Sequence, residues 1–129
     1  MKKKLLLIVF ISFYITNAYS QQSFNGSWKW SNSNSEFSIT INQQSNTITG
    51  SHCSILQNGL KVDCADSNET TLNGTIQGDS LVVNFKSAFS MTVGIAVIKK
   101  LNDTSIQWEI VQKPNREFYI PSLVIMTKQ

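Results

Sequence analysis

The sequence predicts an all-β domain, an antiparallel up-and-down meander of about eight or nine strands that closes into a small barrel. Apolar and polar residues alternate with a period of two in several segments, and no stretch of 11 residues carries a helical stripe of apolar side chains. Turn signals such as Asn58-Gly59 and Gly78-Asp79 separate these segments, as in consecutive hairpins. A β-sandwich is the alternative architecture.

The first 20 residues of the 129-residue chain are predicted to be a secretory signal peptide. Three lysines are followed by an apolar run over residues 5–15 and by Ala18-Tyr19-Ser20, which places small residues at both positions that signal peptidase reads. The apolar run is too short for a membrane span. We therefore expect a secreted or periplasmic protein with one barrel domain over residues 21–129 and no integral membrane segment after signal removal.

The charge balance argues against nucleic acid as a partner. Removal of the three signal lysines from the 11 basic residues leaves 8, which equals the 8 acidic residues. The basic character of the whole chain therefore belongs to the signal segment, and the remaining domain offers no excess of positive charge for phosphates.

The alternation places nine strands along the domain. They are expected at residues 25–31, 36–43, 46–57, 60–65, 71–77, 80–86, 91–100, 105–112 and 117–126. Met91, Val93, Ile95 and Val97 form one of the apolar rows that we expect to face inward. Pro121 lacks an N–H donor, which predicts an edge or a bulge in the last strand.

Apolar residues should meet across each turn, because paired residues share a face of the sheet. The expected turns are centred on Ser33-Asn34, Gln44-Ser45, Asn58-Gly59, Gly78-Asp79, Asn102-Asp103 and Pro114-Asn115. The corresponding pairs include Trp30 with Phe37, Ile41 with Ile48, Ile55 with Val62, Leu72 with Phe85, Val97 with Trp108, and Ile110 with Tyr119.

Two adjacent hairpins disagree about which face of the third strand is buried. The pairing of this strand with the one before it turns His52 inward, whereas the Asn58-Gly59 hairpin turns Ile55 and Val62 inward. A β-bulge at Gly50-Ser51 would absorb the extra residue.

Cys53 and Cys64 fall opposite each other in the Asn58-Gly59 hairpin. In an exported chain with two cysteines, this placement predicts a disulfide bond. A redox role is not expected, because there is no Cys-x-x-Cys spacing, and no metal site is expected, because the chain has a single histidine and no cluster of cysteines. No cofactor motif is found either, since the sequence contains no phosphate-binding glycine-rich loop.

The beginning of the domain resembles avidin and streptavidin, as well as the calycins, which include the lipocalins. The resemblance is carried by Gly26-Ser27-Trp28, by the alternating segment 36–40 and by Ile48-Thr49-Gly50-Ser51, about a quarter of the domain. It implies a β-barrel. The chain as a whole is also similar to small exported bacterial proteins.

The same resemblance argues against biotin as a ligand. When the Gly-x-Trp segments are matched, the biotin-binding asparagine of the family falls on Trp30 and the binding tyrosine falls on His52. Only a serine, at Ser54, is retained.

No catalytic set is predicted. His52, Ser54, Lys61 and Asp63 share one face of the hairpin, but His52 and Ser54 are two residues apart on a strand and too distant to touch. We expect these four side chains to form a solvated polar face. A hydrolase that uses His52 is the least favoured hypothesis.

The leading hypothesis is a non-catalytic exported barrel that binds a small ligand or a protein partner, as inhibitor- or immunity-type domains do. An envelope-associated structural domain without a pocket is the alternative. The candidate binding residues are His52 and Ser54 together with the aromatic residues Trp30, Phe37 and Trp108, which are otherwise core. A filled barrel interior with exposed apolar residues would favour a protein partner over a small ligand.

Overall fold

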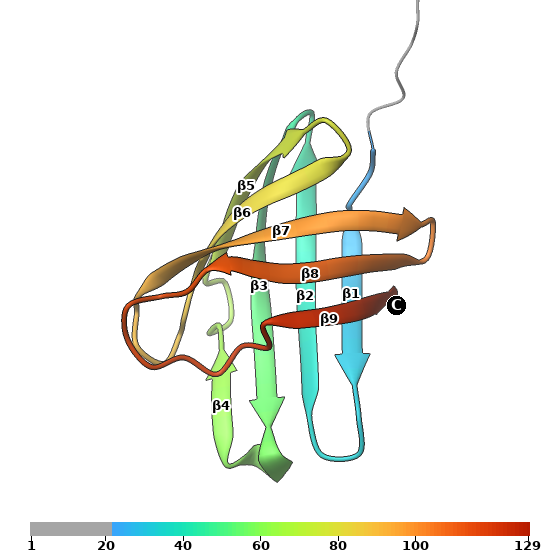
Figure 1. The fold of residues 1–129 in the computed structure, drawn as a ribbon. Helices are drawn as coiled ribbons and strands as arrows, with labels where there is room; N and C mark the ends of the chain where they lie inside the picture. Colours follow the sequence, from blue (N-terminus) through green and yellow to red (C-terminus); the bar gives the residue numbers. More distant parts are fainter. Residues whose placement is uncertain (1–21) are drawn as a thin grey trace, which may run out of the picture.

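The computed structural model describes residues 22–129 and is all-β (Figure 1). The predicted signal peptide lies outside the described residues. The strands are β1 (Gly26–Ser31), β2 (Glu36–Gln44), β3 (Thr47–Leu56), β4 (Lys61–Cys64), β5 (Leu72–Gln77), β6 (Ser80–Lys86), β7 (Val93–Asn102), β8 (Ser105–Gln112) and β9 (Leu123–Lys128). A short 3-10 turn over Gln57–Gly59 joins β3 to β4.

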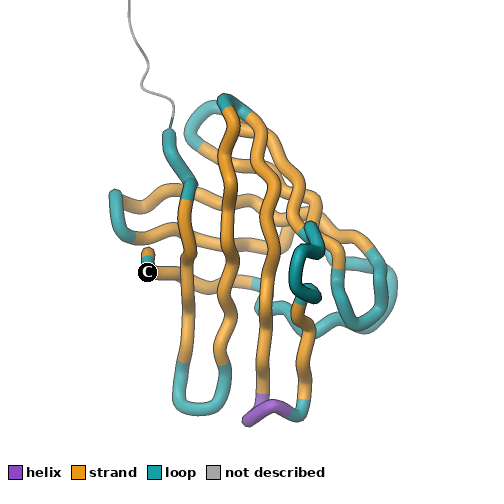
Figure 2. Tube along the Cα trace, turned by 180° about the vertical axis from the view of Figure 1, so that it is seen from behind, coloured by secondary structure: helices purple, strands orange, loops and turns teal. Residues whose placement is uncertain are grey.

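Eight of these strands form a closed antiparallel barrel, and β4 is an additional strand. The barrel closes because β1 pairs with both β2 and β9, while β3 pairs with both β2 and β5. β3 has two successive neighbours on its other side: residues 47–50 pair with β5 and residues 53–56 pair with β4. Figures 1 and 2 show β4 as a short strand beside the far end of β3. The barrel architecture predicted from the alternation is confirmed.

The interior of the barrel is filled by apolar side chains. Trp28, Phe37, Phe85 and Trp108 are fully buried. The indole N–H groups of the two tryptophans are satisfied by carbonyl oxygens, that of Trp28 by Phe24 at 3.0 Å and that of Trp108 by Pro121 at 2.9 Å. Both tryptophans therefore complete the core without an unpaired polar group.

Three of the predicted hairpin registers are confirmed. Trp30 pairs with Phe37 across the first turn, Val62 with Ile55 across the Asn58-Gly59 turn, and Leu72 with Phe85 across the Gly78-Asp79 turn. Gly78 has a φ of +64°, a conformation that favours glycine in a tight turn.

The expected pairing of Val97 with Trp108 is wrong by one residue, because the turn lies one residue later than predicted. Ile98 pairs with Trp108, and an irregularity between Lys100 and Asn102 leaves Leu101 without an opposing residue. The inward row of β7 is therefore Gly94, Ala96 and Ile98, not the expected Met91–Val97 row. Val93 is 55% exposed, whereas Ala96 and Ile98 are fully buried.

The bulge expected at Gly50-Ser51 is absent, since β2 and β3 keep an unbroken register from the Glu36–Ile55 pair to the Gln44–Thr47 pair. His52 points inward, and the outer face of the β3–β4 hairpin carries Ile55 and Val62. Ile41 pairs with Gly50, so the expected Ile41–Ile48 pair is off by two residues, which leaves both isoleucines buried on the same face.

The last hairpin differs most from the prediction. No strand forms over residues 113–122, and β9 begins at Leu123. The expected Ile110–Tyr119 pair does not form, because the N–H of Ile110 bonds the carbonyl of Ser122. Pro121 precedes β9 and does not disturb its ladder. The long segment 113–122 instead crosses to the end of β4, where it contributes to the site below.

Among the described residues there is no helix long and apolar enough to cross a membrane.

Candidate functional site

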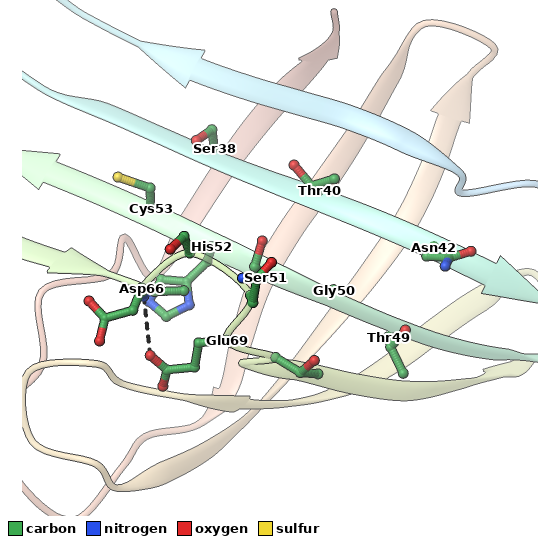
Figure 3. A pocket seen from close by; sticks show the side chains of 14 residues that line it. Ser38, Thr40, Asn42, Thr49, Gly50, Ser51, His52, Cys53, Asp66 and Glu69 are labelled. Atoms are coloured by element: carbon green, nitrogen blue, oxygen red, sulfur yellow. Dashed lines mark hydrogen bonds between the residues drawn. The ribbon is translucent and has the colours of Figure 1, made fainter.

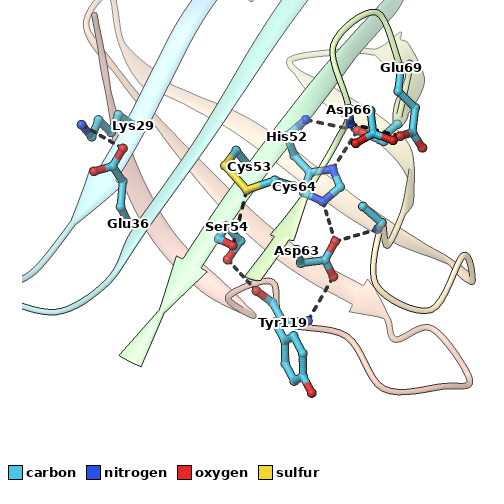
Figure 4. The surroundings of a disulfide bond; sticks show 12 residues. Lys29, Glu36, His52, Cys53, Ser54, Asp63, Cys64, Asp66, Glu69 and Tyr119 are labelled. Atoms are coloured by element: carbon cyan, nitrogen blue, oxygen red, sulfur yellow. Dashed lines mark hydrogen bonds and ion pairs between the residues drawn. A yellow bond between two sulfur atoms is a disulfide. The ribbon is translucent and has the colours of Figure 1, made fainter. Parts of the chain in front are cut away.

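The buried polar residues of the barrel gather where β3 meets β4. Ser54 on β3 lies directly opposite Asp63 on β4, and His52 is the next inward-facing residue along β3. All three side chains are buried, whereas the sequence predicted a solvated face for them. Figure 4 shows them on the inner side of the hairpin, with the Cys53–Cys64 disulfide beside them.

Asp63 is the centre of this cluster and accepts four hydrogen bonds. Oδ1 is bonded by His52 Nε2 at 2.9 Å and by the N–H of Ala88 at 2.7 Å. Oδ2 accepts the Ser87 hydroxyl at 2.6 Å and the N–H of Tyr119 at 3.1 Å. The carboxylate of this β4 residue therefore links β3 and β4 to two segments outside the sheet, residues 87–92 and 113–122.

These hydrogen bonds decide the charge state of Asp63. Burial raises the pKa of the carboxyl group, but the bonds from His52, Ser87, Tyr119 and Ala88 together outweigh it and lower the pKa to about 2. Asp63 is therefore ionised near neutral pH although its side chain is inaccessible to solvent.

His52 joins Asp63 to Thr71. Its Nδ1 lies 2.7 Å from Thr71 Oγ1, and its Nε2 faces Asp63. One proton arrangement satisfies every group: Nε2–H donates to Asp63, the Thr71 hydroxyl donates to Nδ1, and Thr71 Oγ1 accepts the backbone N–H of His52 at 3.1 Å. This is the order of a hydroxyl, a base and an orienting carboxylate.

The side chains of Thr71, His52 and Asp63 are buried, so a substrate in solution does not reach them. The side chains of His52 and Asp63 are 0% exposed, and Thr71 is 2% exposed. Ser54 is not bonded to His52, since its hydroxyl donates to the carbonyl of Tyr119 at 2.5 Å. The cluster anchors backbone segments, and every buried side-chain polar atom described has a hydrogen-bond partner.

Phe37 and Trp108 lie in the apolar core, and Phe37 pairs with Ser54 across β2 and β3. Trp108 packs edge-on against Phe37 with ring centroids 5.2 Å apart, and against Phe85 at 5.5 Å. Trp30 is half-buried and packs on the same cluster. These rings contact one another as part of the apolar core.

The predicted disulfide between Cys53 and Cys64 is present. The two residues are paired across β3 and β4 and face outward from the barrel. The bond therefore fastens the extra strand to the barrel on the side opposite Asp63.

A polar groove of about 680 Å³ lies on the outer face of β2 and β3 (Figure 3). Its lining includes outward-facing side chains of both strands and the loop that follows β4, namely Ser38, Thr40, Asn42, Ser51, Asp66 and Glu69. Glu69 is engaged, because its carboxylate accepts the N–H of Asp66 at 3.1 Å and pairs with Lys86 at 3.2 Å. Within residues 22–129 no three histidine, cysteine or acidic side chains are grouped to hold a metal ion.

Several large apolar side chains are exposed on the surface, at positions that the sequence alone did not indicate. Phe89 is 52% exposed, and its ring lies 4.5 Å from that of Tyr119. Val62 on β4 and Leu60 in the turn before it are 47% and 83% exposed. Further exposed residues lie on the outer face of β7, β8 and β9: Val93, Val111, Leu123 and Ile125.

Comparison of the chain with protein-family models and with curated proteins gave no match.

Proposed function

We propose that this chain is an exported, non-catalytic β-barrel domain that binds another protein. The observation that carries the proposal is the combination of a filled interior with large apolar side chains on the outside. Phe37, Phe85 and Trp108 pack against one another inside the barrel. Ten large hydrophobic residues of the described chain are at least 38% exposed.

The exposed residues have the composition of a protein-binding surface. Leu123 and Ile125 are successive outward-facing residues of β9, and they are 60% and 58% exposed. Gln107 and Glu109 lie opposite them on β8. An apolar centre with polar neighbours is typical of interfaces between separate proteins.

Export is supported by two independent features. The N-terminal segment has the pattern of a secretory signal, and the Cys53–Cys64 disulfide suits an oxidising compartment. A resemblance to calycin-type barrels is part of the same proposal, with the closed eight-stranded barrel as its support.

A non-catalytic role is supported by the burial of His52. The imidazole uses both ring nitrogens on Thr71 and Asp63. A general base needs a face toward the substrate, and this one is enclosed on all sides.

The proposal is tested by purification of the oxidised protein from its native exported fraction after mild cross-linking. We expect one defined protein to co-purify and to bind the isolated domain in calorimetric titration. Replacement of Leu123 and Ile125 by serine, or of Val62 by serine, should weaken that binding, whereas Thr49→Ser on the polar outer face of β3 serves as the matched control. Retention of a small molecule with no protein partner would contradict the proposal.

A further inference from the structure

β4 leaves one of its backbone edges unpaired. The N–H of Ala65 bonds the carbonyl of His52 at 2.9 Å, so the hydrogen-bonded pairs of this ladder are His52–Ala65, Ser54–Asp63 and Leu56–Lys61. The N–H and C=O groups of Val62 and Cys64 therefore point away from β3. Within the described residues these four groups have no hydrogen-bond partner.

Apolar surface lies on both sides of this edge. On the outer side, Val62 and Ile55 face each other across the hairpin and are 47% and 38% exposed. On the inner side, the backbone N–H of Tyr119 bonds Asp63, as Figure 4 shows, and its ring contacts that of Phe89 at a tilt of 48°. A strand added to β4 would bury side chains on both of its faces.

Lys61 gives the edge a charge preference. Its ammonium group lies 5.5 Å from the centre of the Tyr119 ring and is in none of the ion pairs described. The neighbouring carboxylate of Asp63 is already used by four hydrogen bonds. An acidic side chain opposite Lys61 would therefore find an unneutralised cation.

A second copy of this chain fits the edge poorly. If β4 paired antiparallel with itself through Val62 and Cys64, Asp63 would face Asp63 of the other copy. Like charges directly opposite each other destabilise a pair of strands. The geometry favours a different chain with an extended backbone.

We propose that β4 accepts an extended segment of a partner protein as an added strand, hydrogen-bonded to Val62 and Cys64. The segment carries an acidic residue opposite Lys61, an apolar residue opposite Val62, and an apolar residue that packs on Phe89 and Tyr119. This inference deepens the proposed protein-binding function, since it names the surface and the kind of segment that it takes.

The test uses random peptides displayed on phage and selected against the oxidised protein, followed by amide exchange measurements with the best peptide. We expect the selected peptides to share an acidic residue next to apolar ones. On binding, the amides of Val62 and Cys64 should become protected, whereas those of Lys61 and Asp63, already bonded to β3, should change little. Unchanged exchange at Val62 and Cys64 would overturn the proposal.

Variants separate backbone pairing from side-chain contact. Val62→Pro removes a donor that the β3–β4 ladder does not use, and Val62→Thr is the matched control that keeps the N–H. We expect the proline variant to bind about tenfold more weakly and the threonine variant to bind nearly normally. Lys61→Glu should shift the preference from acidic to basic peptides.

A change in the peptide tests the same hydrogen bonds without a substitution that could disturb the folding of the protein. N-methylation of the peptide residue that faces Val62 should weaken binding to the unmodified protein about tenfold, whereas N-methylation of a neighbouring residue should not. If the natural partner binds and is insensitive to Val62→Pro but sensitive to changes at Leu123 and Ile125, the strand-addition proposal fails and the protein-binding function stands. If no natural partner binds, the proposed function fails by itself.

Discussion

His52 Nε2 and Asp63 Oδ1 lie 2.9 Å apart on neighbouring strands, and both side chains are buried. The pair is inaccessible to solvent and is extended by Thr71 on one side and Ser87 on the other. A buried carboxylate of this kind requires all of its partners, because each lost hydrogen bond leaves charge uncompensated.

We expect His52→Ala to lower the free energy of unfolding by about 3 to 5 kcal/mol, since Asp63 and Thr71 would each lose a buried partner. Urea unfolding followed by circular dichroism measures this change. The control is Thr49→Ala, an exposed position on the same strand, which should change stability by less than about 0.5 kcal/mol. Similar effects of the two substitutions would show that the imidazole contributes little.

Acid should destabilise the protein through Asp63. Because the pKa of Asp63 is lowered from 3.8 to about 2 in the folded protein, its contribution is complete above pH 3.8 and is lost as the pH falls toward 2. The expected loss is roughly 2 kcal/mol. Unfolding curves at a series of pH values measure it.

Asp63→Asn should be less stable at neutral pH and should show a flatter pH dependence in this acid range. Asp79→Asn, in the exposed turn between β5 and β6, is the matched control and should retain the wild-type slope. A wild-type slope in the Asp63 variant would place the acid sensitivity elsewhere.

Loss of the disulfide should cost about 3 kcal/mol, because the bond closes a short loop in the unfolded chain. Replacement of both Cys53 and Cys64 by alanine should lower the urea midpoint by the corresponding amount. Dithiothreitol should reproduce this shift in the wild type and leave the double variant unchanged. A wild type that is fully reduced yet equally stable would contradict the expectation.

Trp108→Ala should destabilise the barrel by about 3 to 5 kcal/mol, because the ring is fully buried between Phe37 and Phe85 and its N–H is bonded to Pro121. Trp30→Ala should cost clearly less, since this ring is only half-buried. Thermal and urea unfolding of both variants check the order. The reverse order would mean that Trp108 is not part of the core.

The sequence predicts the register of a hairpin correctly where its turn residues allow one pairing of the two strands. The Gly78-Asp79 turn gave the pairing of Leu72 with Phe85 because an off-by-one register would have exposed the whole apolar row. The same reasoning failed at β7, where Leu101 has no opposing residue and the alternation alone does not reveal the irregularity.

The burial of the polar cluster around Asp63 could not be predicted from the sequence for a different reason. A charged residue is normally exposed, so Asp63 was placed outside. Its burial depends on donors that come from Ala88 and Tyr119, which are 25 and 56 residues away along the chain. The pairing with β2 predicts an inward His52, whereas the expected bulge at Gly50-Ser51 leaves the side of His52 undecided.

The pairing between β1 and β9 also constrains the moment at which this protein can fold. Trp28 and Lys29 of β1 pair with Lys128 and Thr127 of β9, so the barrel closes only after β9 has joined the sheet. If the chain is delivered N-terminus first through a secretion channel, the first hairpins expose their apolar face to solvent until β9 emerges. During that interval the exposed apolar surface would be prone to aggregation, and removal of β9 would leave the barrel open.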